Sequence, residues 1–188
     1  INDRDLSYAK LRFDDRSIAT LKTHLGKFDD ALARALCWAS IWDMHRDAEI
    51  SSSDFIEIAL NGLAGETDDA IVNIVLMQLN TSVEAYAKDS NRAAYREKLA
   101  NGLWALTQNS APGSDLQLLI SRAFAINAQT PEQTAKIREL LNGGAPGLKV
   151  DTDLRWYFLI ALTERGATTK AELDAELATD NTTTGNLA

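Results

Sequence analysis

The sequence predicts an all-α protein whose helices stack in layers. Three observations predict this fold class. Apolar residues recur at helical spacing along most of the 188 residues. Helix start and stop signals separate these segments from one another. A short motif also returns after a constant offset, which is typical of repeat proteins. Only the first residues of the chain depart from the helical pattern.

Residues 8–13 alternate between two faces, which predicts a β-strand. A lone strand leaves its backbone hydrogen-bonding groups unpaired, so this one indicates either the remnant of an upstream β-domain or a partly ordered arm. One face of the predicted strand carries Tyr8, Lys10 and Arg12, and the other carries Ala9, Leu11 and Phe13.

Helices are predicted from four amphipathic stripes over residues 18–28, 72–86, 95–106 and 116–123. Capping-box patterns begin further helices at Ser114, Thr130 and Thr169, each with Gln or Glu three positions later. Pro131 stands at a first helical position, and Gly143-Gly144 gives a stop signal.

Residues 31–42 and 154–162 are apolar on almost every side, which predicts buried helices with neighbours on both faces. Arg34 and Arg155 each interrupt such a segment. A buried guanidinium must be paired, so we expect structural ion pairs with Asp30 or Asp153. The functional alternative is a cavity wall on which either arginine holds a peptide carboxylate.

The internal repeat has an offset of 38 residues. Ser114-Asp115-Leu116-Gln117 returns as Thr152-Asp153-Leu154-Arg155, and Thr130 corresponds to Thr168. This period suits a helix–turn–helix unit close to the armadillo and HEAT range. The predicted architecture is therefore an α-solenoid of helix pairs with one N-terminal strand.

Charge and composition narrow the classes of partner. The net charge of −8 repels phosphate backbones, so nucleic-acid binding is not expected. No apolar run reaches the roughly 20 residues that span a bilayer, so no membrane is expected. The first residues lack a signal-peptide pattern and a starting Met, so we expect an internal part of a longer polypeptide. The single cysteine, Cys37, excludes an internal disulfide and fits a reducing compartment.

Residues for catalysis or metal binding are not found in a recognisable pattern. His24 and His45 are isolated, and no HExxH motif occurs. The acidic cluster at residues 43–49 is interpreted as a solvated helix end. Cys37 lies in the most apolar segment, where we expect a buried thiol with a raised pKa. We therefore predict no catalytic residue and no metal ligand in this chain.

Several segments resemble the C-terminal part of bacterial enzymes of the aminopeptidase N family. Residues 2–14 resemble the last strand of that family's β-sandwich domain. Residues 29–39 and 42–49 are similar to the first long helix of its C-terminal helical domain. Residues 152–156 and 178–185 are similar to its later repeats. The resemblance implies a strand remnant and linker at 1–13 and a helical-repeat C-terminal domain at 14–188, without its final repeats.

The resemblance further implies an armadillo/HEAT-like domain that closes over the active site of a cytoplasmic zinc metallopeptidase. That enzyme removes N-terminal amino acids from peptides. Its zinc and catalytic residues belong to an upstream domain, so this segment carries no cofactor. Its partners would be the upstream catalytic and β-sandwich domains and the peptide substrate. The alternative is a stand-alone helical-repeat scaffold that binds a protein partner.

Overall fold

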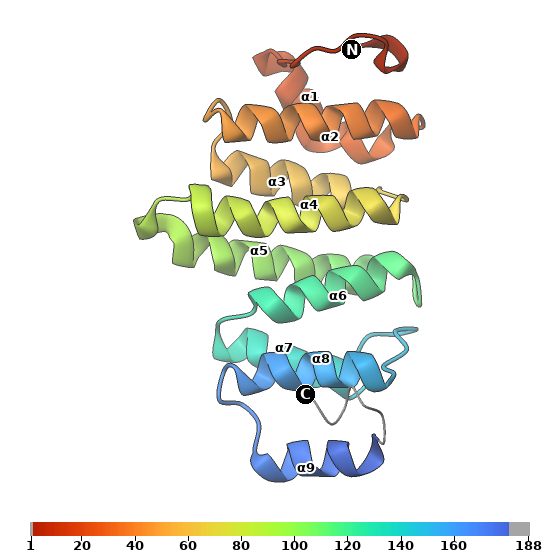
Figure 1. Cartoon of the computed structure of the whole chain (residues 1–188), viewed down its shortest axis with the longest axis vertical. Coiled ribbons are helices and arrows are strands. Elements are labelled where there is room, and N and C mark those ends of the chain that lie inside the picture. Colours follow the sequence, from red (N-terminus) through yellow and green to blue (C-terminus); the bar gives the residue numbers. More distant parts are fainter. Residues whose placement is uncertain (1, 181–188) are drawn as a thin grey trace. The chain divides into compact units, whose positions relative to one another are not determined.

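The computed structural model describes residues 2–180 (Figure 1), and this part of the chain is all-α, as predicted. A 3-10 turn precedes the helices (η1, Asp3–Asp5), a second follows α1 (η2, Leu25–Lys27), and a π-helical turn follows α4 (η3, Ser82–Tyr86). The nine α-helices of the described residues are α1 (Asp15–His24), α2 (Ala31–Arg46), α3 (Ser52–Leu63), α4 (Asp69–Thr81), α5 (Asp89–Asn109), α6 (Asp115–Asn127), α7 (Pro131–Leu141), α8 (Thr152–Thr163) and α9 (Lys170–Thr179).

The strand predicted over residues 8–13 is wrong, because no strand occurs between residues 2 and 180. Alternation alone does not make a strand, since its backbone groups need a neighbouring strand to pair with. Side chains hold the segment to the end of α2 instead. Lys10 pairs with Asp47, and Arg12 pairs with both Asp47 and Glu49.

Side-chain caps begin eight of the described α-helices, and three of these caps were predicted from the sequence. Thr130 and Thr169 form the reciprocal capping boxes that were predicted. Ser114 caps α6 but forms no reciprocal box, because the side chain of Gln117 accepts from the amide of Gly113 instead. The eight capping residues are Asp14, Asp30, Ser51, Asp68, Ser114, Thr130, Asp151 and Thr169.

The chain divides into two compact units, Ile1–Tyr95 and Arg96–Ala188. The boundary between these two units lies inside α5. The division between residues 1–13 and 14–188 concerns another part of the chain and stays a prediction. In the first unit, α3 packs against α1, α2 and α4, and Figure 1 shows α2 to α4 running side by side. Ile41, Phe55 and Val75 are fully buried in this core.

The second unit is centred on α8, which packs against α6 and α7. Phe124, Ile137 and Phe158 are fully buried there. Polar contacts bind α9 to the rest of this unit, and among them are the ion pair of Arg138 with Glu172 and the hydrogen bond from the Trp156 indole to Asp180.

Some side-chain hydrogen bonds within each unit join residues that are 30 to 40 positions apart. The side chain of Asn61 donates to the backbone oxygen of Lys22, 39 residues earlier. Arg138 donates to Glu172 at a separation of 34 residues. The main helix contacts join first and second neighbours along the chain, and the 38-residue repeat stays a prediction.

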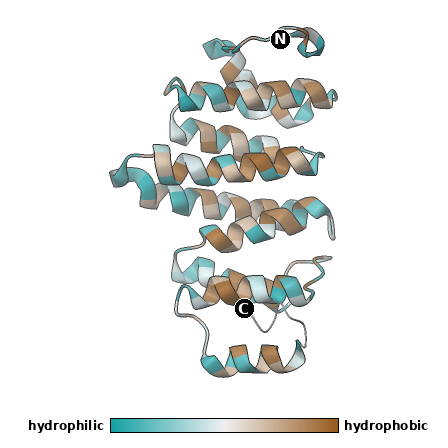
Figure 2. Cartoon of the chain, in the orientation of Figure 1, coloured by the Kyte–Doolittle hydropathy of each residue, from teal (hydrophilic) through white to brown (hydrophobic). Residues whose placement is uncertain are grey.

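Hydropathy separates the helices from their connections (Figure 2), with hydrophobic residues along α3, α4 and α8 and mainly hydrophilic residues in the loops. Helix α8 is largely buried, as expected, and Ile160 is its exposed large apolar residue. Helix α2 is buried on one side, but Leu32 and Ala39 are exposed. Among residues 2–180, no helix is both long and apolar enough to cross a lipid bilayer.

Candidate functional site

Arg34 lies inside the first unit, and Glu66 is its ion-pair partner. The guanidinium Nε and one terminal nitrogen both bind Oε1 of Glu66, at 3.1 and 3.0 Å. The other terminal nitrogen donates to the backbone oxygen of Phe28 at 2.7 Å. The ion-pair interpretation is therefore confirmed, but the expected partner, Asp30, is wrong, because its carboxylate caps α2.

Glu66 is fully buried and keeps a lowered pKa. Burial, the largest single influence, raises this pKa. Hydrogen bonds from Arg34, from the amide of Thr67 and from the Trp38 indole together outweigh burial and lower it. A charged carboxylate with this many donors fixes the loop between α3 and α4 against α2.

Arg155 is more accessible than Arg34. Its guanidinium donates to both oxygens of Glu176 on α9, at 2.7 and 2.6 Å. Its side chain is 41% exposed, whereas that of Glu176 is 7% exposed. Arg155 lines a pocket of about 510 Å³ in the second unit together with Arg138 and Glu172. The expected partner, Asp153, is again wrong, because an acid on the next helix supplies the carboxylate.

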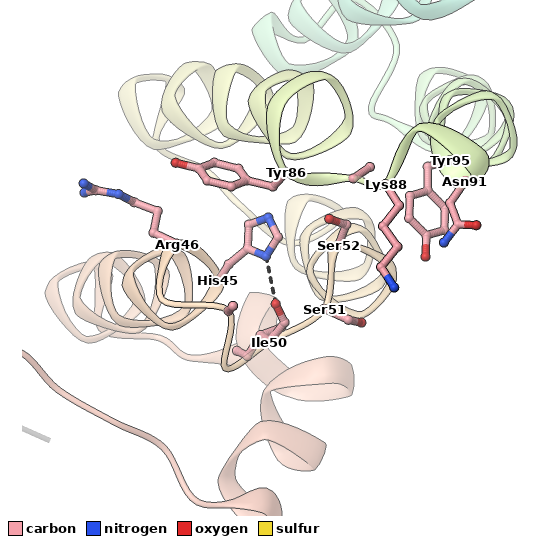
Figure 3. A pocket seen from close by; sticks show the side chains of 11 residues that line it. His45, Arg46, Ile50, Ser51, Ser52, Tyr86, Lys88, Asn91 and Tyr95 are labelled. Carbon is pink, nitrogen blue, oxygen red and sulfur yellow. Dashed lines mark hydrogen bonds between the residues drawn. The ribbon is translucent and has the colours of Figure 1, made fainter.

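A second pocket, which we call the His45 pocket, lies in the first unit and has a volume of about 350 Å³. The end of α2, the start of α3 and the segment from η3 into α5 form its walls (Figure 3). The residues that line it are His45, Arg46, Ala48, Ile50, Ser51, Ser52, Tyr86, Ala87, Lys88, Asn91 and Tyr95.

His45 is 3% exposed and is packed between aromatic rings. Its imidazole stacks on Phe55 with a centroid distance of 4.8 Å, and Tyr86 meets it edge-on at 5.3 Å. Trp42 lies 5.6 Å from the same ring. Burial among these rings lowers the pKa of His45, although its hydrogen bond with the backbone of Ile50 acts in the opposite direction.

The protonation of His45 follows from its hydrogen bonds. Nδ1 lies 2.9 Å from the backbone oxygen of Ile50, drawn as the dashed line in Figure 3, so Nδ1 carries the proton and donates. A neutral imidazole then has a lone pair on Nε2. This nitrogen is buried and has no hydrogen-bond partner among the described residues.

A tight turn after α2 brings Ile50 to His45. The amides of Ala48 and Glu49 donate back to the carbonyls of His45 and Met44, which is a Schellman motif. Ala48 occupies its left-handed position with φ of 62°. Such a conformation costs a residue with a Cβ about 1–2 kcal/mol, and strain of this kind often accompanies a functional site.

Other candidate groups behave as structural elements. Cys37 is buried, and burial raises the pKa of its thiol, as predicted. In the acidic cluster at residues 43–49, Asp47 and Glu49 pair with Lys10 and Arg12. Within residues 2–180, no group of three or more His, Cys, Asp and Glu side chains is arranged to hold a metal.

The sequence interpretation missed the His45 pocket. Helical spacing contained a partial signal, because His45 lies four residues after Ile41 and so belongs to the buried face of α2. Tyr86 and Lys88 carried no such signal. Tyr86 contacts the ring of His45 and Lys88 lines the same pocket, because α4 packs against α2 and η3 packs against α3.

Two comparisons with known proteins bear on this chain. Residues 1–187 match the family described as the ERAP1-like C-terminal domain. The chain is also 41% identical over 187 residues to a protein of Streptomyces lividans named Aminopeptidase N. That alignment covers 98% of this chain and 22% of the relative, so the chain spans about a fifth of the relative's length.

Proposed function

Because this chain belongs to the ERAP1-like C-terminal domain family, we propose that it is the non-catalytic C-terminal cap of an aminopeptidase N-type enzyme. The observation that carries the proposal is the alignment with Aminopeptidase N, which takes in nearly all of this chain but a small part of the relative. The same alignment favours a part of a larger enzyme over the stand-alone scaffold.

In this proposal the helix pairs form a solenoid whose concave face closes over the active site of the parent enzyme. The closed chamber admits short or unfolded peptides and positions them. The parent is a cytoplasmic zinc metallopeptidase that removes N-terminal amino acids. The residues described in this chain do not fit a zinc site, so the upstream catalytic domain would supply the metal, and no chemical step is assigned to this segment.

Exposed apolar side chains support an upstream partner. Leu6 and Tyr8 are almost fully exposed near the start of the chain, and Leu32 is exposed on α2. Leu6 and Tyr8 line a pocket of about 510 Å³ in the first unit together with Ala39. Apolar surface of this kind is costly to leave in water, which supports contact with the proposed β-sandwich and catalytic domains.

Arg155 is the better of the two arginines for a peptide-facing wall. It lines a pocket, and its side chain is partly accessible although its guanidinium binds Glu176. Arg34 is enclosed, and its donors bind Glu66 and backbone oxygens, which supports a structural role. We propose Arg155 as the residue that contacts peptide carboxyl or carbonyl groups in the parent enzyme.

The non-catalytic role is tested by assaying the purified 188-residue chain on aminoacyl p-nitroanilides with added zinc. We expect no turnover and no stoichiometric zinc after dialysis. Turnover that co-purifies with the chain and persists in independent preparations would contradict the proposal.

The cap role is tested in the full-length parent enzyme with Arg155→Ala, using Lys170→Ala as a control for an exposed cation. If Arg155 contacts substrate, KM for longer peptides should rise about tenfold while KM for an aminoacyl p-nitroanilide stays constant. An unchanged KM combined with a lower melting temperature would assign Arg155 a purely structural role.

A further inference from the structure

Helix α9 is attached to the second unit almost without apolar burial. Within α9, only Glu176 is buried, and Asp180, which directly follows the helix, is buried as well. The apolar side chains of α9 are more accessible, since Leu177 is 38% exposed and Leu173 is half-buried. The buried residues of α8, by contrast, are all apolar. Because apolar burial is the main source of folding stability, α9 is held less firmly than α8 by this effect.

Charged side chains hold α9 in place instead. Arg155 on α8 donates to both carboxylate oxygens of Glu176. Arg138 on α7 donates to Glu172 at 2.6 Å. The side chains of Arg138 and Arg155 are 33% and 41% exposed, so water and dissolved ions reach both pairs. Accessible ion pairs of this kind contribute little stability, and salt weakens them further.

A pocket lies where α9 meets α7 and α8. It is the pocket of about 510 Å³ that Arg155 lines, and its apolar wall includes Leu141, Leu159 and Ala175. Closely packed protein interiors leave few spaces larger than a water molecule. Helix α9 therefore covers this side of α7 and α8 without packing closely on it.

The loop before α9 is fixed independently of the helix itself. Arg165 donates to backbone oxygens at the ends of α6 and α8. Arg138 donates to the backbone oxygen of Ala167 with the terminal nitrogen that does not bind Glu172. These bonds do not involve the residues of α9, so the helix can move away from Thr169 onward while the loop stays in place.

We propose that α9 is a charge-held lid, which opens as a unit while the rest of the second unit stays folded. The closed lid keeps the guanidinium of Arg155 on Glu176 and that of Arg138 on Glu172. The open lid releases both guanidinium groups and uncovers the pocket wall on α7 and α8. Local opening is typical of elements with few buried apolar contacts. The consequence for peptide contact rests on the proposed function: a closed lid restrains Arg155, and an open lid releases it.

The first experiment measures amide hydrogen exchange of the full chain by mass spectrometry, at low salt and at about 0.5 M NaCl. We expect the amides of α9 to exchange at least about tenfold faster than those of α8, with one common protection along α9. Salt should speed exchange in α9 about threefold relative to α8. Equal protection of the two helices, or no effect of salt on α9, overturns the proposal. Protection that falls steadily toward residue 179 also overturns it, because that pattern is typical of a fraying end.

The second experiment weakens the lid with two variants and compares them with a control. Arg155→Gln leaves the buried carboxylate of Glu176 without its cation. Glu172→Gln removes the charge that binds Arg138, and its amide oxygen can still complete the capping box. Each variant should speed exchange in α9 at least about threefold relative to α8. Lys170→Gln, which removes an exposed ion pair inside α9, should change it less than about twofold.

Two outcomes of the second experiment overturn the proposal. One is unchanged exchange of α9 in both Arg155→Gln and Glu172→Gln. The other is equal acceleration of α8 and α9, which would indicate that the two helices unfold together. Neither measurement involves peptidase turnover or zinc, so a result against the lid leaves the cap role to its own tests.

Discussion

The carboxylate of Glu66 receives the guanidinium of Arg34 in a place where their side chains are 0% and 6% exposed. The two residues are 32 positions apart and join the start of α2 to the loop after α3. A related arrangement occurs in the second unit, where Glu176 binds Arg155 and the neighbouring Trp156 donates to Asp180. Each unit thus ties an arginine-bearing helix to a later segment through a buried acid.

Removing the charge of Glu66 should destabilise the first unit strongly. In Glu66→Gln, Arg34 stays buried without its anion, and an uncompensated buried charge costs about 3–5 kcal/mol. Urea unfolding followed by circular dichroism measures the loss. The control is Glu132→Gln, whose solvent-exposed pair with Lys136 should contribute little to stability. Similar small losses in both variants would contradict a stabilising buried pair.

Acid should unfold the protein partly through Glu66. Its pKa in the folded state is lower than the ordinary value of 4.5, so the unfolded state binds the proton more readily. The stabilisation is therefore fully present above about pH 4.5 and is lost as the pH falls through the lowered pKa. Unfolding free energies measured between about pH 6 and pH 3 should fall less steeply in Glu66→Gln than in wild type. Parallel curves would disprove the linkage.

His45 should give a separate pH dependence at higher pH. Burial lowers its pKa below 6.5 in the folded state, so the unfolded state takes up the proton first. Stability should decline as the pH falls below about 6.5, until the folded-state pKa is reached. His45→Phe should flatten this part of the stability curve, because the phenyl ring keeps the packing but does not titrate. A decline of the same size in His45→Phe would assign it to another group.

The strained turn after α2 should be relieved by glycine. Ala48 has φ of 62°, where glycine avoids the Cβ penalty, so Ala48→Gly should stabilise the protein by up to about 1 kcal/mol. Ala64 at the end of α3 has an ordinary φ of −59°, and Ala64→Gly should destabilise by about 0.5–1 kcal/mol. Thermal unfolding compares the two. A loss of stability in both variants would show that Ala48 is not strained.

Much of the local structure could be predicted because its signals are short. Thr130 and Thr169 cap helices whose third residues, Gln133 and Glu172, accept hydrogen bonds from the backbone of the cap. Gly143 follows α7 in a left-handed conformation, which ends the helix. The strand predicted at residues 8–13 is wrong, because a strand does not follow from local alternation alone. Its alternation is real, but a strand depends on a neighbour that periodicity does not supply.

The sequence by itself predicted the helical fold class and the caps at Ser114, Thr130 and Thr169, and it indicated that Arg34 and Arg155 require anionic partners. The tertiary structure decided that the partners are Glu66 and Glu176 rather than the nearby Asp30 and Asp153. It also decided that His45 meets Tyr86 and Lys88 in one pocket. Helix caps act over three or four residues, whereas these contacts depend on how whole helices pack against one another.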